Sequence, residues 1–200
     1  MKRYVILFLF SSLTVFSQTK YSISTTKNQL KWLGNSSLGG NGHDGFVKVS
    51  SGLILVSATN QIMKGNFEID MNTIKSIDEK AKDKDKDNGL DEHLKSNDFF
   101  SVSKFPKAYF TIEQAKASIV QPNQYMVNGT LMIKGIANKI QFPAEIIFEG
   151  NNIKVKAIFF INRQLWGITY DSPSLFGFAK EAAIANEIKL TLDLIFEKQP

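Results

Sequence analysis

Residues 129–148, GTLMIKGIANKIQFPAEIIF, decide the fold because apolar and polar side chains alternate through their second half. Phe142 and Ile146 fall on one side of an extended chain, whereas Gln141 and Glu145 fall on the other. This period of two is typical of a β-strand with one buried face. The stretch is therefore predicted to form two strands joined by a turn.

The same alternation returns in residues 153–161 and 188–196, so several long strands share one design. Each strand has an apolar face that must be covered, so the sheet has to fold over itself or meet a second sheet. Shorter alternating stretches occur in residues 21–32, 67–71 and 110–133. The chain is predicted to be one all-β, antiparallel domain.

Turn and helix signals divide these strands. Ser50, Ser51 and Gly52 separate two apolar runs and predict a hairpin turn. Leu90 and Leu94 have the spacing of one helical face, which predicts a short helix ending near Asn97. A second helical turn is predicted within residues 179–186.

The N-terminal stretch predicts an export signal. Lys2 and Arg3 precede an apolar run from Tyr4 to Phe10, followed by small residues and Ser17. This order is typical of a secretory signal peptide, and the run is shorter than the roughly 20 residues that span a bilayer. We expect residues 1–17 to be removed and residues 18–200 to form the domain, placing the protein in the periplasm or outside the cell.

Composition excludes several function classes. Removal of Lys2 and Arg3 lowers Lys+Arg from 24 to 22 against 19 Asp+Glu, which leaves a formal charge of +3. That charge is too small to indicate a nucleic-acid partner, and aromatic residues are not interleaved with basic ones. The absence of cysteine excludes thiol catalysis and thiolate metal sites.

Two features point toward chemistry only weakly. The alternating carboxylates of Asp83, Asp85 and Asp87 resemble the start of a calcium loop, but Asn88 and Leu94 stand where glycine and glutamate are required. We interpret this run as an exposed charged loop and predict no metal site. His43 and His93 are candidates for a hydrolase or a metal-dependent enzyme, but no motif supplies a third partner, and we predict no enzymatic activity.

Five segments, taken in order, resemble the YceI-like family of exported proteins. They are Trp32-x-Gly34 with His43-x-Gly45, Gly65-Asn66-Phe67-x-Ile69-Asp70-Met71, His93-Leu94-Lys95-Ser96-x-Asp98-Phe99-Phe100 with Phe105-Pro106, Gly129-Thr130-Leu131-x-Ile133-x-Gly135, and Asn186-Glu187-Ile188. The chain departs from the family pattern at Ala137-Asn138 and in the charged insertion of residues 83–88. The resemblance implies an antiparallel lipocalin-like β-barrel of about eight strands, with one or two short helices and an apolar cavity for a polyisoprenoid or another long-chain amphiphile.

Strand alternation then assigns the cavity wall, because alternate side chains face the inside of a barrel. The predicted lining residues are Phe67, Ile69, Phe110, Leu131, Ile133, Ile140, Phe142, Ile146, Val155, Phe159, Leu190 and Leu192. The candidate rim or head-group residues are Arg163, Trp166, Phe99 and Phe100. Structural hydrogen bonds to loop carbonyls are an equal alternative for Arg163.

The sequence thus predicts a carrier or store for a long-chain isoprenoid or fatty amphiphile, with no cofactor besides that ligand. The alternatives are the histidine enzyme named above and an interaction module with a solid core, since small barrels either fill their interior or hold a ligand. We expect no stable membrane insertion, and a homodimer is compatible with the sequence.

Overall fold

The computed structural model describes residues 18–36, 42–77, 89–172 and 184–200. They form nine strands and two short helices within these ranges. The elements are β1 (Gln18–Ile23), β2 (Gln29–Ser36), β3 (His43–Ser57), β4 (Ile62–Ser76), α1 (Gly89–Lys95), β5 (Lys107–Ala117), β6 (Gln124–Ile133), β7 (Ile136–Glu149), β8 (Asn152–Asn162), the 3₁₀-helix η2 (Arg163–Trp166) and β9 (Ile184–Lys198). The predicted signal peptide (residues 1–17) and the Asp83–Asp87 run lie outside the described residues.

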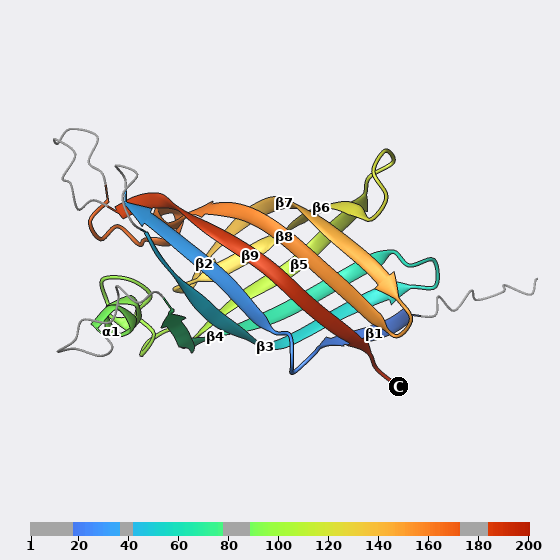
Figure 1. Ribbon diagram of the computed structural model, residues 1–200, viewed down its shortest axis with the longest axis horizontal. Coiled ribbons are helices and arrows are strands. Elements are labelled where there is room, and N and C mark those ends of the chain that lie inside the picture. The colour runs from blue at the N-terminus through green and yellow to red at the C-terminus, as the bar shows by residue number, and fades with distance from the viewer. Residues whose placement is uncertain (1–17, 37–41, 78–88, 173–183) are drawn as a thin grey trace, which may run out of the picture.

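The strands form a closed antiparallel barrel (Figure 1). Their order is β1-β3-β2-β9-β8-β7-β6-β5-β4, and pairing of β3 with β4 closes the ring. Both β1 and β2 pair with β3 and with β9, so these two short strands together occupy one position of an eight-position barrel. The predicted antiparallel barrel is confirmed.

Helix α1 lies at one end of the barrel, opposite the C-terminus (Figure 1), and we call this the helix end. Asp91 ties the helix to the sheet, because its Oδ1 accepts a hydrogen bond of 2.7 Å from the backbone N–H of Ser76 at the end of β4. Leu94 is buried on the same helix. The short helix predicted from Leu90 and Leu94 is confirmed. Among the described residues, no helix is long and apolar enough to cross a membrane.

Two local predictions were wrong. Ser50, Ser51 and Gly52 do not turn the chain, because β3 runs through them with a register shift against β4 between Val49 and Ser51. Gly52 is buried, and the ring of Phe67 would lie 3.0 Å from an added Cβ, so this glycine makes room inside the barrel. In the stretch predicted to be helical, residues 184–186 belong to β9, and residues 179–183 lie outside the described ranges.

Gly45 should be indispensable where β2, β3 and β4 meet. A Cβ on Gly45 would lie 2.0 Å from the backbone oxygen of Lys75 and 2.5 Å from the ring of Trp32, whereas a Cβ on Gly34 would meet nothing within 4 Å. We expect Gly45→Ala to lower the free energy of unfolding by about 1–3 kcal/mol or more through overpacking. We expect Gly34→Ala to change it by less than about 1 kcal/mol. Urea unfolding of both variants checks this, and equal midpoints would contradict it.

Candidate ligand-binding cavity

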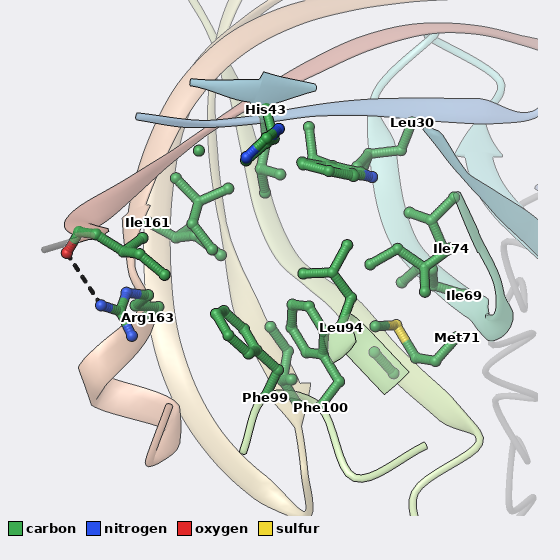
Figure 2. Close-up of a pocket in the computed structure, with 18 of the residues that line it drawn as sticks. Leu30, His43, Ile69, Met71, Ile74, Leu94, Phe99, Phe100, Ile161 and Arg163 are labelled. Carbon is green, nitrogen blue, oxygen red and sulfur yellow. Dashed lines mark hydrogen bonds between the residues drawn. The ribbon is translucent and has the colours of Figure 1, made fainter. Parts of the chain in front are cut away.

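A cavity of about 430 Å³ fills the helix-end half of the barrel (Figure 2). This volume lies within the range of roughly 300–1,000 Å³ that is usual for small-molecule sites. Most of its wall is hydrocarbon contributed by strands on all sides, by α1 and by the segment that follows α1. The apolar wall includes Leu30, Trp32, Val47, Ile69, Met71, Ile74, Leu90, Leu94, Phe99, Phe100, Ala108, Leu131, Ile133, Ile161, Ile184, Ile188 and Leu190.

Polar groups in this wall come from the helix end. Asn35 and Ser36 lie at the end of β2, His43 begins β3, and Arg163 begins η2. Figure 2 shows His43 and Arg163 at the edge of the cavity, while Leu30, Ile69 and Ile74 lie on the apolar side. Most polar groups of the described wall therefore lie near the helix end, and Trp32, which pairs with Leu190 across β2 and β9, adds an indole N–H nearer the waist.

A second cavity, of about 90 Å³, lies in the other half of the barrel. Its wall is apolar and includes the rings of Phe67, Phe110, Phe142, Phe159 and Phe196. The two cavities share four wall residues, Leu30, Ile69, Leu131 and Leu190, which come from four different strands. These four side chains, which we call the waist, mark the boundary between an open half and a nearly filled half.

The predicted lining residues divide unevenly between the cavities. All of them except Ile133 border the small cavity. Ile69, Leu131, Ile133 and Leu190 border the large one. Strand alternation thus identified which side chains point inward, but most of the predicted residues lie in the half that aromatic rings fill. Contact of any of them with a ligand stays a prediction.

Sequence reasoning missed much of the large cavity's wall. Met71 and Ile74 on β4 and Leu90 and Leu94 on α1 border it. In the sequence, the clear alternation of β4 ends at Met71. The spacing of Leu90 and Leu94 predicts a helix face but gives no sign of contact with a ligand. Ile161 and Ile188 pair across β8 and β9 and continue the alternation that includes Phe159 and Leu190. The same alternation in the sequence could therefore have identified Ile161 and Ile188 as wall residues.

Phe99 and Phe100 border the large cavity next to α1, as Figure 2 shows. Phe99 is buried, and its ring packs edge-on against His93, with 5.0 Å between centroids. Tyr170 lies against the other two rings, with centroids 4.6 Å from His93 and 5.5 Å from Phe99. These three rings form an aromatic cluster beside the cavity at the helix end.

Arg163 is almost fully buried at the polar end of the large cavity, with 1% of its surface exposed. Its Nε donates to the carbonyl of Ala185 at 3.1 Å, and its Nη1 and Nη2 donate to Ile168 and Ile184 at 3.0 Å each. In the described part of the chain, no carboxylate forms an ion pair with it. Burial lowers the pKa of the guanidinium, and the field of Asp171 acts in the opposite direction.

These bonds give Arg163 the structural role that had been weighed equally with ligand binding, because they hold η2 against the start of β9. They also leave donor capacity, since a guanidinium carries five N–H groups and the bonds use three nitrogens. The Arg163 charge lies 6.0 Å from the centroid of the Phe99 ring, within cation–π range. The residue can therefore hold the wall together and still present a positive group to the cavity.

Trp166 does not line either cavity and is not at a rim. Its side chain has 0% exposure, and its Nε1 donates a hydrogen bond of 3.1 Å to the carbonyl of Leu131. The pairing of β7 with β8 ends at Ala144 and Ala157, next to Pro143, which has no N–H to donate. Helix η2 contacts β7 and β9 there, and Asn138 donates its side-chain N–H to Leu165 at 2.9 Å. Trp166 thus completes the barrel wall.

The two histidines lie in different surroundings. His93 packs between Phe99 and Tyr170, and His43 is an exposed residue at the cavity edge. Within the ranges that the structure describes, no group of three or more His, Asp or Glu side chains could hold a metal ion.

Comparison with known proteins identifies the family of this barrel. A family model described as the YceI-like domain matches residues 21–196. A UPF0312 protein of Photorhabdus laumondii is 34% identical over 62 residues, and one of Pectobacterium atrosepticum is 32% identical over the same length. Each match spans about a third of this chain and about a third of the relative (31% of each).

Solved structures share the fold at low sequence identity. BcnA of Burkholderia cenocepacia is 16% identical, with a TM-score of 0.67 over 86% of this chain and 98% of that one. A polyisoprenoid binding domain of Saccharophagus degradans is 12% identical, with a TM-score of 0.60 over 90% and 98% of the two chains. The YceI protein of Campylobacter jejuni is 16% identical, with a TM-score of 0.53 over 100% and 99%. On the match that covers residues 21–196, this chain belongs to the YceI-like family.

Proposed function

We propose that this protein binds one long-chain isoprenoid or fatty amphiphile in its large cavity, as an exported carrier or storage protein. The observation that carries the proposal is a hollow of about 430 Å³ whose wall is mostly hydrocarbon. A long apolar tail suits such a wall because dispersion and desolvation require no directional partner. The Saccharophagus degradans neighbour is described as a polyisoprenoid binding domain, which agrees with this ligand class.

The energetics favour a long tail. Each buried methylene contributes roughly 0.8 kcal/mol, whereas association costs on the order of 4–15 kcal/mol. A tail of about ten carbons therefore barely offsets the cost, and a tail of about twenty has a surplus. An added methylene contributes this binding free energy only while the cavity still has empty volume for it.

Affinity is expected to rise with tail length until the cavity is full. Calorimetric titration of fatty acids, amides and isoprenoids of graded length measures this directly. Each added buried methylene should strengthen binding by about fourfold over the rising part of the series. A flat response across the series would contradict the proposal.

Reducing the volume of the cavity should weaken binding. Ala108 is 3% exposed and borders the large cavity. We expect Ala108→Phe to weaken binding of a long tail at least about tenfold, because the added ring occupies volume that the tail requires. Ala137→Phe, on the exposed face of β7, adds the same ring outside the barrel and should leave affinity unchanged. Equal loss in both variants would argue against the cavity as the site.

Orientation follows from the position of Arg163. We propose that the polar head lies toward Arg163 and the tail toward the waist, since a buried cation favours an anionic or carbonyl oxygen. Arg163→Met should reduce affinity for an anionic-headed ligand by about tenfold or more relative to a neutral-headed ligand with the same tail. Calorimetry on both ligands separates the roles, because loss of the bonds to Ala185, Ile168 and Ile184 alone would weaken both ligands equally.

Export is part of the proposal and rests on the N-terminal sequence. Cleavage after Ser17 would leave Gln18, the first residue of β1, at the N-terminus. Mass spectrometry of the protein recovered from the periplasmic or extracellular fraction is expected to give a chain that begins at Gln18. An intact chain that begins at Met1 and fractionates with membranes would contradict removal of the signal.

A further inference from the structure

Five phenylalanine rings form a connected layer across the barrel on the far side of the waist. The ring centroids are 5.7 Å apart for Phe196 and Phe67, 5.9 Å for Phe67 and Phe110, 5.8 Å for Phe110 and Phe142, and 4.1 Å for Phe142 and Phe159. The five residues come from β9, β4, β5, β7 and β8. All five border the small cavity, and the described wall of the large cavity includes none of them.

Glycines make room for this layer. A Cβ on Gly129 would lie 2.6 Å from the Phe110 ring, and a Cβ on Gly65 would lie 2.9 Å from the Phe67 ring. A Cβ on Gly52 would lie 3.0 Å from Phe67 and 3.3 Å from Phe196. Glycine thus stands at three positions inside the barrel where a larger side chain would collide with the rings. These glycines fix the position of the layer.

The layer is not solid. Phe67, Phe110 and Phe159 are only partly buried although they belong to the inside of the barrel, and a space of about 90 Å³ remains beside the rings. Phe159 pairs with the waist residue Leu190 across β8 and β9, and Phe110 pairs with the waist residue Leu131 across β5 and β6, so these two rings of the layer lie beside the waist. Phe142 stacks on Phe159 with 9° between the ring planes.

We propose that the stacked pair of Phe142 and Phe159 is the floor of the ligand site and sets the longest tail that the barrel accepts. This inference rests on the proposed function. A tail that enters from the helix end passes the waist and meets the flat stack. The stacked rings narrow the path into the apolar space of about 90 Å³ that they border together with the waist residues, so removing either ring should admit a longer tail to that space.

The test is the tail-length series repeated on floor variants. Phe159→Leu keeps an apolar side chain but removes the ring, so the tail length at which affinity stops rising should increase. Tails beyond the wild-type limit should bind roughly fifteenfold more tightly for every two additional methylenes that become buried. Phe142→Leu removes the other ring of the pair and should move the limit in the same direction, which keeps the test open if Phe159→Leu does not fold.

Phe148→Leu is the matched control. Phe148 lies on β7 like Phe142 and is partly buried, but it borders neither cavity. An unchanged length limit in both floor variants, or an equal shift in Phe148→Leu, would overturn the floor assignment alone. Wild-type protein that binds no tail of any length would overturn the proposed function and the floor assignment together.

Discussion

The pairing of β3 with β4 closes the barrel, and the remainder of the structure depends on that closure. Once the ring is closed, one face of every strand must share a single interior. A regular alternation of side chains then leaves two options at each level of the barrel, to fill the interior or to enclose a space. This chain takes both options, with aromatic rings in one half and aliphatic side chains of moderate size around a hollow in the other.

The distribution of side-chain size explains why the hollow is at the helix end. There most inward strand positions carry Ile, Leu, Val, Met or Ala besides Trp32, while the five phenylalanine rings and the glycines that accommodate them lie beyond the waist. Helix α1, the Phe99–Phe100 segment and η2 cover the end of the barrel without entering it as a plug, and Asp91 and Trp166 fix two of these covers by hydrogen bonds to the sheet. The hollow therefore depends on the elements that cover this end of the barrel as well as on the side chains of the strands.

The barrel and the inward side chains were predictable because strand alternation is a local signal that a closed sheet must obey. Phe142, Phe159 and Leu190 were correctly assigned to the interior on that basis. The division into a filled and an open half was not predictable, since it depends on which rings meet across strands far apart in sequence, as Phe67 and Phe196 do. Trp166 was misplaced at the rim for a similar reason, because only the end of the β7–β8 pairing beside Pro143 creates the space it fills.

The buried charge of Arg163 gives this cavity a direction. A guanidinium to which the described residues offer no ion pair is costly in an apolar interior, and the carbonyls of Ile168, Ile184 and Ala185 offset only part of that cost. A ligand oxygen that accepts from the remaining donors would stabilise the protein and be bound by the same contact. In the proposed complex, the cation at one end and the phenylalanine layer at the other favour one orientation of an amphiphile, with its polar group near Arg163 and its tail directed toward the layer.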